Sequence, residues 1–286
     1  MAQLLFNALR GKFVLGNDSM GGDALDPTKI NGLNKAEQHD WTLDAVSNYY
    51  YKTASDVQLA MPGLKMWLPA HKLTGLSDDD PLTTWTDSSP NNNDASQSSA
   101  TLKPLYKTNI LNGKPVIRFD GTDDYMNVSA ITGVDWSDGE KALIMVVKCN
   151  TAESNFFSVG SANYQTWQLQ SSPTNNYFQR LASSNGSSWN EDNVGDVALD
   201  AFKIVSIIGD GSTEKAYVNG VLQFTDTHGA FSLNNSDIKI GAHYSLAPYM
   251  LDGDIAEILV GNKCLSDTEH IEQLTRLDAF YNLGIY

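Results

Sequence analysis

The chain has 286 residues, 41% hydrophobic and 10% aromatic, which is enough to bury the core of one main domain with an appendage. Its 34 acidic and 19 basic residues give a formal net charge of -15, which argues against nucleic acid, because phosphate backbones are bound by clustered Lys and Arg. No run approaches the roughly 18 apolar residues of a membrane span, and MAQLLFNALRGKF lacks a cationic lead and a cleavage site. Neither membrane insertion nor conventional secretion is therefore expected.

Residues 1–60 differ in composition from the rest. The stretch 20-MGGDALDPTKINGL-33 is typical of irregular coil, and residues 34–52 are typical of a short helix that Asn34 and Glu37 open. This segment has too little apolar content to fold alone. We predict a mostly irregular N-terminal arm that docks on its own domain, a sister subunit or a larger assembly.

From residue 61 onward, short strand-like segments alternate with turns rich in Asn, Asp, Gly and Ser, which predicts an antiparallel sandwich. In 142-ALIMVV-147 every position is apolar, which indicates a strand covered on both faces. In 164-YQTWQLQ-170, Gln165 and Gln168 flank Trp167 and Leu169, so we expect one wet face. The main strands are expected at residues 115–119, 142–149, 155–160, 164–170, 176–182 and 202–209.

Two local signals are sharper. Asn219 and Gly220 predict a two-residue hairpin turn in 213-TEKAYVNGVLQF-224. In 266-SDTEHIEQLTRLDAFYNLG-284, Ser266 and Glu269 form a capping box that opens a C-terminal helix. The helix should end at Gly284. It should bury one stripe of residues, namely Ile271, Leu274, Leu277 and Phe280.

The stretch 116-VIRFDGTDDYMNV-128 places Asp120, Asp123 and Asp124 in one short bend. Asp and Gly are the residues that such a turn needs without any ligand. Calcium is the alternative, since hard cations are held by several oxygen ligands from loops, although no EF-hand spacing is present.

Other candidate site residues are scattered. Cys149 and Cys264 read as two unpaired thiols, with a disulfide as the alternative. The five histidines show no HxH or HExxH pattern, so no zinc site is expected. Glycan binding needs aromatic rings beside polar groups, and the candidates are Trp189, Tyr244 and Tyr249, with ordinary packing of these rings as the alternative.

Two blocks, 67-WLPAHKLTGLSDDDPLTTWTDSSPNNNDASQ-97 and 251-LDGDIAEILVGNKCLSDTEHIEQL-274, resemble laminin-G-like domains of the concanavalin A-like lectin/glucanase superfamily. The resemblance covers residues 61–286. It implies an all-β, two-sheet antiparallel jelly-roll sandwich with a C-terminal helix, in a family of glycan-binding modules, adhesion domains, virion proteins and a few enzymes. Fold alone does not fix the function. In such domains FDGTDDY is a structural signature.

The segment 252-DGDIAE-257 is similar to the catalytic strand of the glucanases in this superfamily. On a regular strand Asp252 and Asp254 share a face at about 6.7 Å, whereas Glu257 faces the other way unless a bulge intervenes. An inverting glycosidase separates its carboxyls by about 6.5 to 9.5 Å. Noncatalytic laminin-G-like members also carry this motif, so a glycoside hydrolase using these three residues is the less favoured alternative.

Together these features predict a noncatalytic virion protein of a bacteriophage, serving as a capsid decoration, tail or fibre component. Residues 1–60 would bind other virion proteins, and residues 61–286 would display the sandwich, attaching weakly to host-surface glycans as a homo-oligomer. The alternative is a free extracellular carbohydrate-binding or adhesion protein.

Overall fold

The computed structural model describes residues 61–286 with gaps at 138, 153, 162–164, 172–176, 184–189, 197–200, 228–232, 234–236, 245 and 247–248, together with two strands near the N-terminus. The chain divides into two compact units, Met1–Val57 and Gln58–Tyr286. In the first unit, β1 (Leu4–Asn7) and β2 (Lys12–Leu15) pair as an antiparallel hairpin. The helix expected at residues 34–52 falls outside the described residues.

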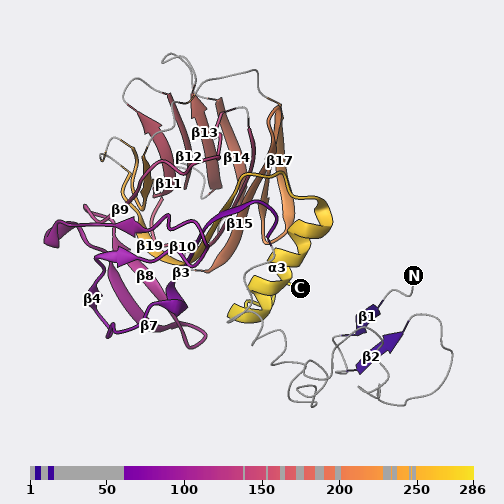
Figure 1. Cartoon of the computed structure of the whole chain (residues 1–286), viewed down its shortest axis with the longest axis horizontal. Coiled ribbons are helices and arrows are strands. Elements are labelled where there is room, and N and C mark those ends of the chain that lie inside the picture. The colour runs from indigo at the N-terminus through magenta and orange to yellow at the C-terminus, as the bar shows by residue number, and fades with distance from the viewer. Residues whose placement is uncertain are drawn as a thin grey trace. The chain divides into compact units, whose positions relative to one another are not determined.

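The second unit is a sandwich of two antiparallel sheets, as the sequence predicted (Figure 1). The helix-covered sheet has the order β17-β16-β15-β10-β19-β8-β7-β4, and β3 also pairs with β19. Its strands are β3 (Leu64–Pro69), β4 (Asp80–Pro81), β7 (Leu105–Leu111), β8 (Lys114–Asp120), β10 (Glu140–Cys149), β15 (Lys203–Asp210), β16 (Thr213–Val218), β17 (Val221–Thr227) and β19 (Asp252–Gly261).

The polar sheet has the order β14-β13-β12-β11-β18-β9-β6-β5. Its strands are β5 (Thr84–Trp85), β6 (Ala95–Ser96), β9 (Met126–Val128), β11 (Asn155–Ser161), β12 (Gln165–Ser171), β13 (Tyr177–Ser183), β14 (Asn190–Asp196) and β18 (Ile238–Ile240). The described helices are η2 (Ala70–Lys72), η3 (Ala100–Leu102) and α3 (Asp267–Tyr281).

The helix-covered sheet separates two hydrophobic cores. Strand β10 alternates between them: Leu143, Met145 and Val147 enter the core between the sheets, whereas Ile144 and Val146 face α3 on the other side. The continuous apolar run of β10 is therefore explained by burial on both faces, which confirms that prediction. Figure 1 shows α3 lying along the outside of this sheet.

Helix α3 starts at the predicted capping box, in which the Ser266 hydroxyl accepts from the backbone of Glu269 and the Glu269 carboxylate accepts in return. The predicted stripe is partly wrong, because Ile271 is 52% exposed. Leu274 and Leu277 are buried as predicted, but the ends of the buried stripe are His270 and Tyr281, which face the sheet with them at positions i, i+4, i+7 and i+11.

The end of α3 also differs from the prediction. The left-handed residue that ends the helix is Asn282, with φ of 51°, and Gly284 lies beyond it. The predicted hairpin turn is present, with φ of 49° at Asn219 and 74° at Gly220. None of the helices described is both long and apolar enough to cross a membrane. No disulfide joins Cys149 to Cys264.

A buried ion pair lies in the core between the sheets. The Lys141 ammonium is 2.8 Å from a Glu214 carboxylate oxygen, and both side chains are 1% exposed. They come from strands on either side of β15 and meet over Gly209, whose missing side chain leaves the space that they fill. The Trp167 indole N–H also donates to Glu214. Because both charges are removed from water, each one is stabilised only by its partners within the fold.

We predict that Lys141→Met lowers the free energy of unfolding by about 3 to 5 kcal/mol, because it leaves the Glu214 charge buried without its cation. Lys141→Met combined with Glu214→Gln should be more stable than the single variant, since the amide keeps an acceptor for Trp167 but carries no charge. Urea unfolding of the three proteins measures the difference. A double variant less stable than Lys141→Met would contradict this view of the pair.

Candidate functional site

The turn after β8 gathers three carboxylates. Ligand atoms of Asp120, Asp123 and Asp124 all lie within 4.8 Å of one another, and Asp124 is buried while the other two are exposed. Asp120 accepts from the backbone N–H of Thr122 at 2.8 Å and of Asp123 at 3.3 Å, and its own N–H donates to Asp124. These bonds are those of a turn built by an aspartate. The same three carboxylates are oxygen ligands of the kind that calcium prefers.

The electrostatic environment of this turn disfavours ionisation of Asp124. Burial and the neighbouring Asp120 carboxylate raise the pKa of Asp124 to about 7, although the Asp120 N–H opposes the shift. A carboxyl group in this position is protonated over much of the acidic range and becomes ionised near neutrality. The turn is therefore a pH-sensitive element of the fold and becomes a stronger oxygen cluster as pH rises.

The aromatic loop after β18 lies beside this turn. Strands β9 and β18 pair antiparallel, so the residues before Met126 are next to those after Ile240, and the Gly121 N–H donates to Leu251 O at 2.9 Å. Tyr244 and Tyr249 are half-buried in this loop. The sequence candidates in the two loops are thus brought to one end of the sandwich. Trp189 lies outside the described residues.

Within the aromatic loop, the rings pack on one another. The His243 ring is 4.2 Å from the Tyr244 ring and 5.9 Å from the Tyr249 ring, and burial lowers the pKa of His243 to about 4. Tyr249 has φ of 81°, a backbone conformation that costs energy for a residue with a bulky side chain. The His243 ring is therefore neutral at physiological pH. It packs with the rings of Tyr244 and Tyr249 into one aromatic cluster.

The glucanase-like carboxylates of β19 have structural partners. A bulge at Ala256 brings Glu257 to the same face as Asp254, which a regular strand would not do. Asp254 is fully buried and accepts two hydrogen bonds from the Arg118 guanidinium, at 2.7 and 2.9 Å. Asp252 accepts from the Asn150 amide at 2.8 Å. Each carboxylate is thus committed to a hydrogen bond within the fold.

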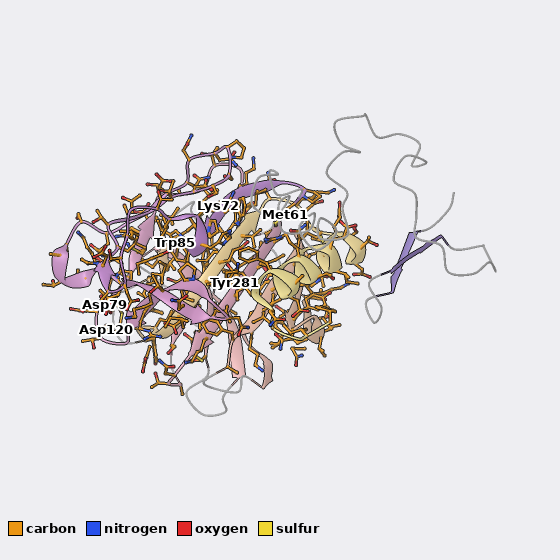
Figure 2. All side chains as sticks on the ribbon, turned by 90° about the horizontal axis from the view of Figure 1, so that it is seen from below. Met61, Lys72, Asp79, Trp85, Asp120 and Tyr281 are labelled. Atoms are coloured by element: carbon orange, nitrogen blue, oxygen red, sulfur yellow. The ribbon has the colours of Figure 1, made fainter. Side chains whose placement is uncertain are left out.

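Glu257 is the most enclosed of these groups. It is fully buried and accepts from the Trp67 indole at 2.8 Å, the Arg276 guanidinium at 2.7 Å and the Tyr281 hydroxyl at 2.9 Å. Burial alone would raise the pKa of Glu257, but the charge of Arg276 and these hydrogen bonds hold it below its usual value. Glu257 is therefore an ionised carboxylate buried beneath α3, and Tyr281 of this helix is labelled in Figure 2. A catalytic acid needs a proton to donate and contact with the substrate, and Glu257 has neither.

The outer face of the polar sheet carries a continuous row of polar residues. Cross-strand pairing aligns them in one line, and from the edge inward they are Thr84, Ser96, Asn127, Lys239, Ser158 and Gln168. The inner part of the row is covered: Gln168 is 1% exposed and accepts from the Asn155 amide, so the expected wet face of β12 is wrong. The Ser158 hydroxyl is likewise buried and donates to Ala242 O.

The outer part of the row is accessible, and we call Thr84, Ser96, Asn127, Lys239 and the adjoining Tyr125 the polar track. Thr84 and Ser96 are exposed, and the other three are half-buried. The Lys239 ammonium lies 5.6 Å from the centre of the Tyr125 ring and donates to the Asn127 side chain. At about 4.8 Å per strand, the row from Thr84 to Lys239 spans about 14 Å.

Sequence reasoning missed the polar track. Its signal is present in 125-YMNV-128, where Met126 and Val128 are buried and Tyr125 and Asn127 face outward. A ring beside an amide, an ammonium and hydroxyl groups is the set of groups that fixes a sugar by stacking and hydrogen bonding.

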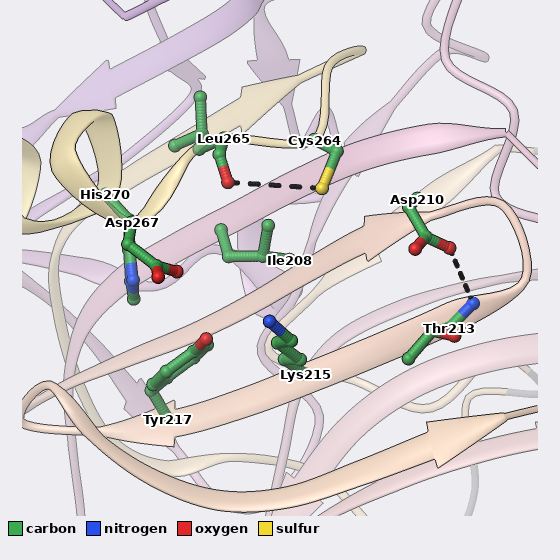
Figure 3. Close-up of a pocket in the computed structure, with 9 residues that line it drawn as sticks. All are labelled: Ile208, Asp210, Thr213, Lys215, Tyr217, Cys264, Leu265, Asp267 and His270. Atoms are coloured by element: carbon green, nitrogen blue, oxygen red, sulfur yellow. Dashed lines mark hydrogen bonds between the residues drawn. The ribbon is translucent and has the colours of Figure 1, made fainter.

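Two of the hollows on the described surface bear on the site. One, between α3 and strands β15 and β16, has a volume of about 60 Å³ and is lined by Lys215, Tyr217, Cys264 and His270 among others (Figure 3). The other lies beside β5 at the end of the polar track and has a volume of about 400 Å³. Small-molecule sites usually measure roughly 300 to 1,000 Å³, so only the second is of that size.

We predict that, in a chelator, the contribution of Asp124 to the thermal stability of the wild type falls as pH rises from 3.8 to about 7. The raised pKa means that Asp124 is protonated in the fold but ionised in the unfolded chain, so its stabilising contribution is fully present below pH 3.8 and is lost as pH rises to about 7. Asp124→Asn should remove most of this fall, whereas Asn at the exposed Asp237 should leave it unchanged. Equal pH profiles for wild type and Asp124→Asn in scanning calorimetry would contradict the prediction.

Solved structures with the same fold include a domain of an arabinanase and several binding domains. Domain 4 of AbnA, a GH43 extracellular arabinanase from Geobacillus stearothermophilus, in complex with arabinotriose, is 15% identical, with a TM-score of 0.55 over 74% of this chain and 97% of that one. The botulinum neurotoxin serotype D binding domain is 12% identical, with a TM-score of 0.56 over 74% of this chain. This chain spans about half the length of that binding domain, 51%.

The binding domain of Paraclostridial Mosquitocidal Protein 1 is 9% identical, with a TM-score of 0.56 over 74% of this chain and 52% of that one. At these identities the likeness concerns the fold alone. No curated protein matches the sequence. The model of one family matches residues 120–269, just over half of the chain, and includes the acidic turn, β19 and the start of α3. The chain therefore belongs to the concanavalin A-like lectin/glucanases superfamily.

Proposed function

We propose that this chain is a noncatalytic virion protein of a bacteriophage, which attaches to other virion proteins through residues 1–60 and displays a glycan-binding sandwich through residues 61–286. The polar track carries the glycan-binding part of the proposal, because it places one aromatic ring and several hydrogen-bonding groups along an accessible line of about 14 Å. Such a line matches a short oligosaccharide laid across the strands. The relative that was solved with arabinotriose makes this trisaccharide the first probe.

The environment of the β19 carboxylates supports a noncatalytic role. Retaining or inverting hydrolysis needs two carboxyl groups on either side of a bound sugar, one of them able to give a proton. Asp254 and Glu257 are both 0% exposed and held by guanidinium groups, so neither meets a ligand. Binding without turnover fits this arrangement.

The virion part of the proposal rests on the first unit of the chain. Its described portion is the hairpin of β1 and β2, and a two-stranded sheet is at best marginally stable in water by itself. Docking on a partner would bury that hairpin. Repeated copies in a symmetric particle would also raise the avidity of a shallow sugar site.

The acidic turn is the place where we propose a calcium ion, if the assembly uses one. Asp120, Asp123 and Asp124 would supply oxygen ligands, and a cation would favour the ionised form of Asp124. The aromatic loop with Tyr244 and Tyr249 lies beside it and is a second place where a sugar would find rings. Trp189 stays a prediction.

We expect Tyr125→Ala to weaken binding of arabinotriose or another neutral trisaccharide by about tenfold, because it removes the ring of the polar track. Tyr286→Ala removes an exposed ring at the C-terminus and serves as the matched control. Titration calorimetry with the full chain measures both. Loss of binding in Tyr244→Ala or Tyr249→Ala, with Tyr125→Ala unaffected, would move the site to the aromatic loop.

Removal of residues 1–60 should abolish incorporation into particles and leave a folded sandwich, because the second unit has its own two cores. Light scattering and particle imaging of the full chain and the truncated chain, with and without chelator, measure this. A truncated chain that still assembles would overturn the docking role. A full chain that is a free monomer would favour the alternative, an extracellular carbohydrate-binding or adhesion protein.

A further inference from the structure

The hollow beside β5 continues the polar track. Thr84 belongs to both, since it is the outermost member of the cross-strand row and also lines the hollow. β5 is the last strand of the polar sheet on this side. A linear ligand that follows the track from Lys239 toward Thr84 therefore arrives at the hollow and leaves the sheet there.

The walls of the hollow have two kinds of chemistry. From Thr84 onward the chain alternates strictly, with Trp85, Asp87 and Ser89 buried and Thr84, Thr86 and Ser88 facing the hollow. Residues two apart on an extended chain share a face at about 6.7 Å, so the three hydroxyl groups form a row.

Another part of the lining is the segment after η2. Leu73 and Leu76 line the hollow while packing on the core between the sheets, and Thr74 and Pro81 complete its rim. The lining of the hollow thus combines hydroxyl groups with apolar carbons. This combination fits a sugar residue, which has C–H groups on its faces and hydroxyl groups at its edge.

The net charge of the whole chain favours a neutral sugar. Lys72 is the one charged residue of the described lining, and its ammonium lies 4.2 Å from the centre of the Trp67 ring (Lys72 is labelled in Figure 2). The chain as a whole carries a net charge of -15, which repels anionic glycans at long range.

We propose that the hollow beside β5 is a terminal subsite, which holds the end residue of a neutral oligosaccharide bound along the polar track. The hydroxyl groups of Thr84 and Thr86 bind the hydroxyl groups of this end residue, and the wall of Leu73 and Leu76 stops the ligand from extending further. This subsite rests on the proposed glycan-binding function. It makes a trisaccharide a better ligand than a disaccharide.

The test compares the full chain with Thr84→Val/Thr86→Val, which deletes two hydroxyl groups at exposed positions and keeps the branched shape. The matched control is Thr225→Val/Thr275→Val, two exposed threonines on β17 and α3. Titration calorimetry is done with neutral trisaccharides, starting with arabinotriose, and with the corresponding disaccharides. We expect about tenfold weaker trisaccharide binding and loss of the preference for the longer ligand, with the control unchanged.

A second variant fills the same hollow without touching its hydroxyl row. Thr74→Trp at the exposed rim should also abolish the preference for the trisaccharide. If Tyr125→Ala weakens trisaccharide binding but both hollow variants bind like the wild type, the terminal subsite is wrong and the proposed function stands. If the wild type binds no neutral trisaccharide in the panel, the proposed function fails and the subsite fails with it.

Discussion

The solvation of one buried carboxylate, that of Glu257, governs the arrangement of the helix-covered sheet and α3. The charge has no access to water, so it must be satisfied by donors from the fold. Those donors are Trp67 from β3 and Arg276 and Tyr281 from α3. The first strand of the sandwich and its last helix are thereby joined at the centre of the sheet, although they are about 200 residues apart in the sequence.

The bulge in β19 makes this junction possible. If β19 were regular through Ala256, Glu257 would point into the apolar core between the sheets, away from its donors Trp67, Arg276 and Tyr281. The carbonyl of Ala256, freed from regular pairing, lies 3.2 Å from the Tyr281 hydroxyl. A motif that resembles a catalytic strand therefore holds a helix in place, through the bonds of Arg276 and Tyr281 to Glu257.

With one face covered, the proposed glycan site lies on the other sheet. α3 covers the outer face of the central strands of the helix-covered sheet, and among the described residues the polar sheet offers the accessible line from Thr84 to Lys239. The same chain segments connect this line to the acidic turn and to the aromatic loop. Charge, rings and hydroxyl groups thus gather on one side of the sandwich because the antiparallel pairing of β9 with β18 brings their flanking loops together.

How much of this follows from the sequence depends on the range of the interaction. Turns and caps are local, and Asn219, Gly220, Ser266 and Glu269 carry their conformation in their own side chains or backbone freedom, so they were predicted correctly. The burial of β10 on both faces and the two-sheet class were also predicted. The burial of Gln168 was not predicted, because it depends on tertiary packing that the local pattern of β12 does not encode.

The polar track was missed for the same reason. Thr84, Ser96, Asn127 and Lys239 come from four separate strands, and nothing in their spacing shows that they form one row until the register is known. Ile271 illustrates a finer limit: the helical period was recognised and Leu274 and Leu277 are buried, but the first buried position of the stripe is His270, about 100° around the helix from Ile271. Periodicity gives the type of element more securely than its rotation.

The chemistry of the polar track sets a ceiling on its affinity. A single half-buried ring and a few exposed hydroxyl groups lie on an open sheet, where each hydrogen bond to a sugar replaces one to water and contributes only about 1 kcal/mol. A site of this kind binds weakly as a single copy and is useful when many copies act on one surface. The proposed docking of residues 1–60 would supply those copies, so the two units of the chain would depend on each other for function even though each is a separate compact unit.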